Sequence, residues 1–370
     1  MAKFEETGPR APITESTRVD LVHPRARLGV TIRAIIAIVI VVIMLFPVIW
    51  LALTMIKTRP DAVAVPPKFI PYFQDGFLSD WCMVPQLNKD GTPKLDKDGR
   101  PVLKERPVCF DVTLEGIVGL FFERRTLTPA QQKQYMESPE FGWAERILLK
   151  RGLVITGPSE FVDRFRNSLI IAGTSTVLAV VFGLLAAYAF SRFDIQGKPD
   201  FLFFILSTRM LPPVVVTIPI FLMYRQLGIY DTHIGMILLY TVFNLSLSVW
   251  LLKGFLDEIP REYEEAALVD GYSRLQAFRK VVLPQAATGI AATTVFCLIF
   301  AWNEYAFSLM LTSDVARTMP PSIASTQGAG GLEWAIIATA SMLFLIPVVV
   351  ITFALRQHLL RGVTFGAIRQ

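Results

Sequence analysis

The stretch Glu264-Glu265-Ala266-Ala267-Leu268-Val269-Asp270-Gly271, which runs on to Val281-Val282-Leu283-Pro284, organises the rest of this chain. It lies in a charged loop, residues 258–284, between two long apolar runs. Ile259-Pro260 favours a helix start, and the glutamates that follow suit the positive N-terminal end of a helix. Gly271 permits the turn that ends this helix. The pattern predicts a helix–turn–helix that is exposed to a partner in water; the alternative is an ordinary amphipathic helix at the membrane interface.

The spacing of this stretch resembles the EAA loop of importer permeases of the ATP-binding-cassette (ABC) class. Glu265-Ala266-Ala267 is followed by three residues, Gly271, nine residues and then Val281-x-Leu283-Pro284, with valine in place of the usual isoleucine. In that family the loop forms a coupling helix that sits in a cleft of the ATPase subunit. The resemblance therefore implies an ATPase-coupling role for Glu264, Glu265, Ala266, Ala267, Asp270 and Gly271.

Further motifs resemble the sugar permeases of the maltose type. These are Asn167-Ser168-Leu169, Ala186-Ala187-Tyr188-Ala189, Trp302-Asn303-Glu304 and the tail Arg361-Gly362-Val363-Thr364-Phe365-Gly366-Ala367. The resemblance covers roughly residues 28–72 and 160–370. It implies a permease subunit that forms half of a translocation pathway for a sugar, polyol or related solute. It also implies a second permease subunit, two ATPase subunits that bind ATP and Mg, and an extracytoplasmic solute-binding protein.

Composition places the chain in a lipid bilayer. Of its 370 residues 53% are hydrophobic, above the roughly 45–50% of soluble domains, and the mean hydropathy is +0.48. The formal net charge is +5, but the basic residues cluster at the ends of apolar runs, so no nucleic-acid partner is expected. The first apolar run is too long for the apolar core of a cleaved signal peptide, about 7–15 residues. With the family resemblance, this indicates a multi-pass protein of the bacterial inner membrane.

Six apolar runs predict an all-α membrane protein with six transmembrane helices, each long enough to cross about 30 Å of hydrocarbon. The runs are Ala34–Ile56, Ser168–Phe190, Phe201–Tyr224, Ile234–Leu252, Gln285–Leu311 and Trp334–Leu355. With both termini inside, the inner segments hold 16 Lys/Arg and the short outer loops hold 2. This asymmetry predicts cytoplasmic N- and C-termini, and it places the 258–284 loop in the cytoplasm.

The predicted domain organisation follows from these spans. It comprises a cytoplasmic N-terminal arm (1–33), the first transmembrane helix (34–56), an extracytoplasmic loop (57–165) with an inserted domain (about 75–158), a five-helix permease core (166–358) that includes the coupling loop, and a cytoplasmic tail (359–370). The resemblance implies that the tail also reaches the ATPases. The alternative is a frayed terminus.

The insertion at about 75–158 lies outside the resemblance and is polar and rich in turn signals. Asp90-Gly91 and Asp98-Gly99 predict two tight turns. Pro129 predicts a helix start with Thr128 as N-cap, and a second helix is expected from Phe141 to Lys150. Cys82 and Cys109 face an oxidising compartment, where a disulfide is expected, with two free thiols as the alternative. We expect a small cap that docks the solute-binding protein; a structural lid is the alternative.

The chain shows no catalytic or metal-binding pattern. No Gly-x4-Gly-Lys-Ser/Thr phosphate loop occurs, so ATP hydrolysis must be supplied by another subunit. His23, His233 and His358 stand alone, without the spacing of a metal site. The sequence therefore predicts a transport subunit that binds no cofactor of its own, and not an enzyme.

Polar residues inside apolar runs are the candidates for the translocation pathway. Arg209 lies in the third run before Pro212-Pro213, which leave backbone carbonyls without donors and imply a cavity or a packed interface. Trp302-Asn303-Glu304 offers a ring and hydrogen-bonding groups to a hydroxylated solute. The alternatives are that Arg209 pairs within the bundle for assembly and that Trp302-Asn303-Glu304 bonds neighbouring helices together.

A second class of function is a secondary transporter or channel that works alone. Such proteins usually show internal hydropathy repeats and intramembrane carboxylates that couple ions. Here Glu304 is the single acid within the apolar runs, and no repeat is visible. The loop at 258–284 favours the ABC importer permease.

Overall fold

The structure is a computed structural model that describes residues 24–73, 79–88, 90–137, 143–150, 152–328 and 331–365. Its internal contacts divide the chain into two units, Met1–Trp50 and Leu51–Gln370. The first 23 residues of the expected arm and the last five of the expected tail lie outside the described residues.

Most of helix α1 (Pro24–Thr54) belongs to the first unit. The helix begins ten residues before the expected start of the first span at Ala34, because proline suits the first turn of a helix and no break follows it. Its apolar side chains are exposed, and Met44 reaches 72%. A surface of this kind is stable against lipid or a partner helix, not against water.

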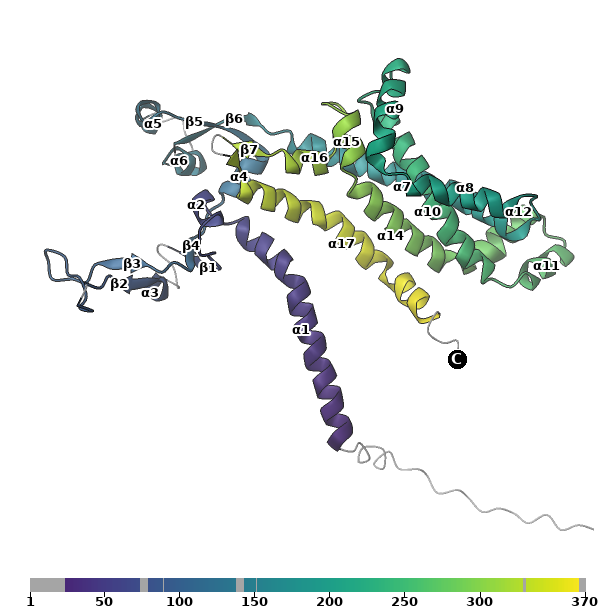
Figure 1. Ribbon diagram of the computed structural model, residues 1–370, viewed down its shortest axis with the longest axis horizontal. Coiled ribbons are helices and arrows are strands. Elements are labelled where there is room, and N and C mark those ends of the chain that lie inside the picture. Colours follow the sequence, from purple (N-terminus) through teal and green to yellow (C-terminus); the bar gives the residue numbers. More distant parts are fainter. Residues whose placement is uncertain are drawn as a thin grey trace, which may run out of the picture. The chain divides into compact units, whose positions relative to one another are not determined.

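Long helices form the body of the second unit and pack side by side (Figure 1). They are α7 (Phe161–Arg192), α10 (His233–Asp257), α14 (Ala287–Trp302) and α17 (Trp334–Phe365). Among the described residues, four helices, in α1, α7, α10 and α17, are long and apolar enough to cross a membrane by themselves. The number rises to as many as six if each of two bent helix pairs counts as one span.

The first bent pair consists of α8 (Lys198–Met210) and α9 (Pro213–Gln226), which meet at 92°. The expected third span is therefore interrupted where Pro212-Pro213 predicted a break. Pro212 and Pro213 lack amide protons, so they cannot continue the hydrogen bonds of α8. The hydroxyl of Thr217 donates to the carbonyl of Pro213 over 2.6 Å and occupies one acceptor in the first turn of α9.

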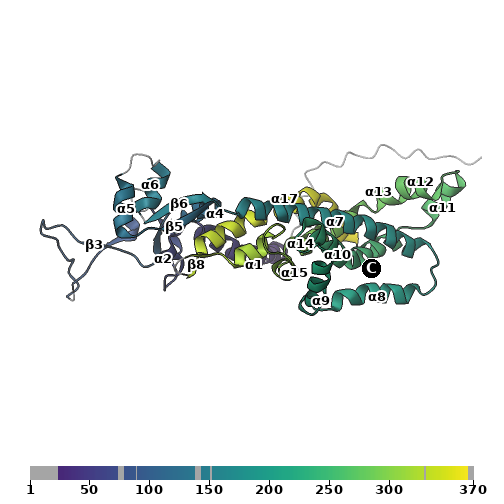
Figure 2. The same cartoon turned by 90° about the horizontal axis from the view of Figure 1, so that it is seen from above.

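The second bent pair joins Arg274–Gln285 to α14 at 73°. It follows α11 (Glu262–Val269) and contains α12 (Arg274–Ala277), a π-helical turn (Phe278–Val282) and α13 (Leu283–Gln285). These elements lie at the opposite end of the long helices from α16 (Met319–Ala324) (Figures 1 and 2). The expected fifth run to Leu311 is not one helix, because α14 ends at Trp302 and α15 spans Ala306–Leu311.

The region between α1 and α7 contains short elements, so the chain is mostly helical and not all-α. The helices are α2 (Arg59–Ala62), α3 (Ser79–Cys82), α4 (Glu115–Phe121), α5 (Pro129–Met136) and α6 (Trp143–Lys150). The strands are β1 (Ile70–Tyr72), β2 (Met83–Pro85), β3 (Leu103–Glu105), β4 (Cys109–Asp111), β5 (Phe122–Thr126) and β6 (Leu153–Pro158). Parallel β1–β4 and antiparallel β2–β3 and β5–β6 form two-stranded sheets, and a fourth joins β7 (Gln327–Gly328) to β8 (Gly331–Leu332).

Local signals in the insertion are confirmed. Gly91 and Gly99 adopt φ angles of 77° and 78°, and their amides close turns onto Asn88 and Asp96. Thr128 caps α5, and Gln131 completes the capping box. The disulfide Cys82–Cys109 has a Cα–Cα distance of 5.9 Å and ties α3 to β4.

The insertion is anchored on the start of α17 through α4. A Cβ atom added at Gly116 would lie 2.5 Å from the carbonyl oxygen of Met55 and 2.7 Å from that of Ala335, so only glycine permits this approach. Glu333, just before α17, pairs with Arg59 at 3.4 Å and with Arg124 at 3.9 Å. The insertion therefore packs against the N-terminal end of α17.

Candidate coupling and translocation sites

Helix α11 is the centre of the predicted coupling loop; it begins at Glu262, two residues after the expected proline start at Pro260, and ends before Gly271 as the sequence predicts. Glu262, Glu264 and Glu265 occupy its first turn, where the helix dipole favours acids. Gly271 adopts a φ of 88°, a left-handed conformation that glycine accepts without strain. Ser273 then caps α12 in a capping box with Gln276.

Glu264 faces into the protein and joins α11 to the end of α7. Its side chain is 6% exposed, and Oε2 accepts from Nε of Arg192 over 3.0 Å. The hydroxyl of Tyr188 donates to its other oxygen. Arg192 also donates to the carbonyl of Ile259 over 3.0 Å. A buried, hydrogen-bonded ion pair of this kind fixes geometry, because removing either charge leaves the other unpaired.

Further contacts hold the same junction. Arg261 donates to the carbonyl of Ser191 over 2.7 Å, and the hydroxyl of Ser191 donates to Asp257 over 2.6 Å. The rings of Tyr188 and Phe278 lie 4.6 Å apart. We call Tyr188, Arg192, Glu264, Arg261 and Ser191 the inner joint. These residues connect α7 to α11, and the hydroxyl of Ser191 connects α7 to Asp257 at the end of α10.

The structure divides the predicted coupling residues into two groups. Glu264 and Ala267 are buried, whereas Glu265, Ala266, Asp270 and Gly271 are exposed. Val269 is 88% exposed and Tyr263 is 55% exposed beside them. The sequence pattern alone assigns both sets the same coupling role. Helical spacing could have separated them, since Glu264 and Ala267 are three residues apart on one face.

Arg209 lies at the last turn of α8, beside the bend. Its guanidinium lies 4.2 Å from the ring centroid of Phe300 and 5.4 Å from that of Phe243. Nη1 donates to the carbonyl of Phe243 over 3.3 Å. No carboxylate pairs with Arg209 among the residues described. Aromatic rings and one carbonyl thus hold this cation on the bundle.

Trp302, Asn303 and Glu304 have separate surroundings. Trp302 is 3% exposed, stacks on Phe344 at 4.6 Å and donates to the carbonyl of Phe344 over 2.9 Å. Its ring therefore offers no free face to a solute in this structure. Asn303 is exposed, and its amide side chain donates to the carbonyl of Ile299 over 2.8 Å.

Glu304 caps α15 and explains the break after α14. Its carboxylate accepts from the amides of Phe307 at 2.8 Å and Ser308 at 3.1 Å. The hydroxyl of Tyr240 donates to it over 2.8 Å. These contacts give Glu304 a structural role across helices, which was the alternative for Trp302-Asn303-Glu304.

A second network, which the sequence analysis missed, fixes the loop between α15 and α16. The carboxylate of Asp231 accepts from the hydroxyl of Ser313 and from the amides of Asp314, Val315 and Ala316, at 2.8 to 3.0 Å. Burial alone would raise the pKa of Asp231, but these hydrogen bonds lower it to about 2. Asp231 adopts a φ of 54°, in the left-handed region that aspartate tolerates.

The N-terminal end of α7 binds the same loop. Nδ2 of Asn167 donates to the carbonyls of Val315 at 2.8 Å and Arg317 at 3.0 Å, and Oδ1 lies 2.7 Å from Nε2 of His233. The hydroxyl of Ser168 accepts from the amide of Met319 at 2.8 Å. We call Asn167, Ser168, Asp231 and His233, with the loop they hold, the outer joint. The Asn167-Ser168 motif was the sequence signal from which this network could have been predicted.

Within the described part of the chain, no group of three or more His, Cys, Asp or Glu residues could hold a metal ion. The buried acids Glu304 and Glu264 serve instead as a helix cap and as an ion-pair partner.

Comparisons with known proteins agree with this architecture. Residues 179–365 match the family described as "Binding-protein-dependent transport system inner membrane component". The inner membrane ABC transporter permease protein YcjP of Escherichia coli is 35% identical, over 56% of this chain and 75% of that relative. The trehalose transport system permease protein SugB of Mycobacterium tuberculosis is 37% identical, over 56% of this chain and 77% of that relative. The trehalose/maltose transport system permease protein MalG of Thermococcus litoralis is 32% identical, over 58% and 79%.

A solved structure shows the same fold. A chain from the crystal structure of a bacterial ABC transporter involved in the import of the acidic polysaccharide alginate aligns with a TM-score of 0.55. The alignment has 18% identity and covers 91% of this chain and 98% of that chain. The resemblance to maltose-type permeases is thus confirmed at the level of the family. The chain belongs to the binding-protein-dependent transport system inner membrane components: it is a multi-pass inner-membrane permease of an ABC transporter, a transport subunit whose ATPase is a separate partner.

Proposed function

We propose that this chain forms half of the translocation pathway of an importer for a sugar, polyol or related solute, and that α11 couples it to a cytoplasmic ATPase. In this proposal the chain crosses the membrane six times, and both termini lie in the cytoplasm. The excess of basic residues in the inner segments supports this orientation. It places α11 at the cytoplasmic surface and the insertion on the outer side.

The inner joint is the observation that carries the coupling role. Glu264 is buried against Arg192, while Glu265, Val269 and Asp270 on the other face of α11 are exposed. A helix of eight residues has little stability by itself, and here tertiary contacts hold it in place. One face is fixed to α7 and the other is free to contact a partner. Movement of an ATPase bound to the free face would then displace α7 and α10.

The relatives support the solute class and the partners. Two of the relatives described above are named for the transport of trehalose or of trehalose and maltose. A further relative is the diacetylchitobiose uptake system permease protein DasC of Streptomyces coelicolor, which is 32% identical. We expect a second permease subunit, two ATPase subunits that bind ATP and Mg, and an extracytoplasmic solute-binding protein. The tail at 359–370 is proposed as a second contact with the ATPases.

Arg209 remains the pathway candidate among the polar residues of the spans. It lies at a bend whose surroundings, Met210, Leu211, Val214 and Val215, are all more than half exposed. This exposed surface suits the second permease subunit and the pathway between the two subunits. Trp302 is buried, so we propose no solute contact for its ring.

The insertion is proposed to help dock the solute-binding protein. The segment that contains β2 and β3 is closed by the Cys82–Cys109 disulfide. It carries exposed apolar side chains, such as Leu87 at 61% and Leu95 at 58%. Exposed aliphatic groups on a fixed segment suit a protein contact. Replacing residues 78–155 by a short Gly/Ser linker should lower stimulation of the ATPase by the binding protein while basal hydrolysis persists. Loss of subunit assembly would point to a structural lid instead.

The coupling proposal is tested on the free face of α11. In proteoliposomes that contain the whole complex, Glu265→Lys and Val269→Asp should each lower binding-protein-stimulated ATP hydrolysis and uptake at least tenfold. The matched control is Glu258→Lys, an exposed glutamate just before the loop helix. Uptake at the wild-type rate by both variants, with the ATPase bound, would rule out α11 as the coupling helix.

A further inference from the structure

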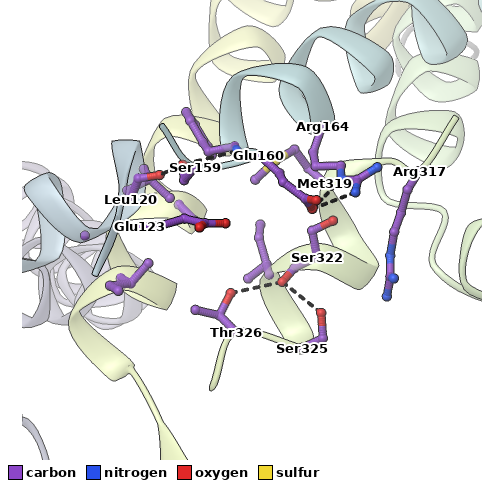
Figure 3. Close-up of a pocket in the computed structure, with 15 residues that line it drawn as sticks. Leu120, Glu123, Ser159, Glu160, Arg164, Arg317, Met319, Ser322, Ser325 and Thr326 are labelled. Atoms are coloured by element: carbon purple, nitrogen blue, oxygen red, sulfur yellow. Dashed lines mark hydrogen bonds and ion pairs between the residues drawn. The ribbon is translucent and has the colours of Figure 1, made fainter. Parts of the chain in front are cut away.

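A pocket of about 370 Å³ lies between the insertion and the permease core (Figure 3). Its walls come from α4 and β5, from the start of α7, and from α16 and α17. In the orientation proposed above, on which this inference rests, it opens on the extracytoplasmic side. Its volume is within the range of about 300–1,000 Å³ that is usual for small-molecule sites.

The lining of the pocket has an apolar part and a polar part. Leu120, Phe161, Met319 and Ile336 supply apolar surface. Glu123, Arg317, Ser322, Ser325 and Thr326 supply a carboxylate, a guanidinium and three hydroxyl groups. Figure 3 shows Glu123 and Arg317 on opposite sides of the view, with Ser322, Ser325 and Thr326 grouped between them. A sugar or polyol has the matching character, with C–H groups that pack on apolar side chains and hydroxyls that hydrogen-bond.

The walls are held in place by hydrogen bonds within the lining and to the outer joint. Asn167 donates a hydrogen bond to the backbone carbonyl of Arg317, and Ser168 accepts one from the backbone amide of Met319. The outer joint therefore fixes the wall of the pocket that Arg317 and Met319 form. On the opposite side, the hydroxyl of Ser159 donates to the carbonyl of Leu120 and accepts from the amide of Phe161 at 3.3 Å. A pocket fixed in this way loses little conformational entropy when a ligand binds.

Arg317 and Glu123 keep their polar groups available. Nε of Arg317 is buried without a hydrogen-bond partner. Within the described ranges, neither the Arg317 guanidinium nor the Glu123 carboxylate forms an ion pair. Arg164, by contrast, is occupied by Glu160 at 2.6 Å and Asp314 at 2.7 Å. A buried donor without a partner costs free energy, and a ligand acceptor would satisfy it.

We propose that this pocket is an accessory site for a neutral hydroxylated solute, a sugar or polyol, on the outer side of the permease. Arg317 donates to ligand hydroxyl oxygens, Glu123 accepts from ligand hydroxyls, and the apolar wall packs against the carbon skeleton. The lining holds two glutamates, Glu123 and Glu160, and two arginines, Arg164 and Arg317, so its formal charge is balanced and suits a neutral ligand. The site is distinct from Arg209, which lies on α8, an element that contributes nothing to this pocket.

The test measures solute binding by the whole permease–ATPase complex in nanodiscs, without ATP and without the solute-binding protein. The probes are radiolabelled trehalose, maltose and mannitol, each measured by equilibrium dialysis up to millimolar concentration. We expect saturable binding of at least one probe. Arg317→Met, which keeps length but removes the donors, should weaken it at least tenfold, and Ala340→Phe should abolish it by filling the pocket.

Arg166→Met is the matched control, because Arg166 is exposed on α7 and does not line this pocket. Basal ATP hydrolysis is measured for every variant to show that the complex is folded. Absence of saturable binding of all three probes to the wild type overturns the proposal, as does equal binding by Arg317→Met and Arg166→Met. Loss of binding-protein stimulation in Arg317→Met without a change in probe binding would identify a protein-docking socket and also overturn it.

These outcomes are separate from those that test the proposed function. Failure of the accessory site leaves ATP-dependent uptake driven by the binding protein intact. Failure of the importer assignment abolishes that uptake in the wild type, whatever the dialysis shows.

Discussion

The inner and outer joints hold the two ends of α7 by a different balance of side-chain and backbone contacts. At the inner end, Arg192 and Glu264 form a buried ion pair between two side chains at 3.0 Å. At the outer end, Asp231 and Asn167 bind backbone amides and carbonyls of one loop. A side-chain pair positions a single point on a helix, whereas backbone capture fixes the path of a whole segment. The inner joint is therefore suited to transmitting movement between helices, and the outer joint is suited to holding a loop in a fixed position.

Breaking the inner joint should have the largest effect. Glu264→Ala leaves Arg192 buried without its partner, which costs about 3–5 kcal/mol. We expect a large loss of thermal stability of the purified complex and loss of uptake. The double variant Glu264→Met/Arg192→Met removes both charges and should recover most of the stability, since apolar replacements of buried pairs are often neutral.

The double variant separates folding from coupling. If it is as unstable as Glu264→Ala, the ion pair is not what holds α11. If stability returns but uptake does not, the joint transmits movement and is more than a packing contact.

The second prediction concerns the anchoring of the insertion at the outer end of α17. In Gly116→Ala the new methyl group would lie within 2.8 Å of Met55, Ala335 and Thr339. Overpacking of this kind costs about 1–3 kcal/mol. We expect lower thermal stability and weaker stimulation by the binding protein. Gly173→Ala in α7, where no atom lies within 4 Å, is the control and should not be destabilised.

Local signals predicted the ends of elements well. Pro129 and Thr128 start α5, Gly271 ends the turn after α11, and Pro212-Pro213 mark the bend between α8 and α9. Each depends on the backbone preference of one or two residues, so it can be read from sequence. The angle of that bend, 92°, cannot be read from the sequence, because it depends on packing against other helices.

The contacts that define the sites depend on distant residues. Glu264 is buried because of Arg192, 72 residues away in the sequence, and the other carboxylates of the loop have no such partner. Asp231 binds amides 83 to 85 residues ahead of it. Hydropathy joined α14 and α15 into one run because it does not detect a glutamate cap. Such pairings need the fold before they can be recognised.

The third prediction breaks the outer joint. Asp231→Ala leaves three amides and the Ser313 hydroxyl without their acceptor, although water can reach part of this loop. We expect a cost of about 2 kcal/mol and faster hydrogen exchange at the amides of residues 314–316. Asp163→Ala, a nearby exposed carboxylate on α7, should change neither. Unchanged exchange in Asp231→Ala would show that the loop holds its shape without this carboxylate.

The smallest effect is the pH dependence of the outer joint. The pKa of Asp231 is lowered to about 2, below its ordinary value near 3.9. A carboxylate with a depressed pKa stabilises the folded state above its unfolded pKa, and this contribution is lost as the pH falls through the folded pKa. The difference in protection at residues 314–316 between the wild type and Asp231→Asn should therefore stay constant from pH 8 to about 5. It should shrink between about pH 4 and pH 2. Hydrogen exchange measured along a pH series, corrected for the intrinsic exchange rate, checks this. A difference that already disappears between pH 7 and pH 5 would mean that a titrating group other than Asp231 controls the joint.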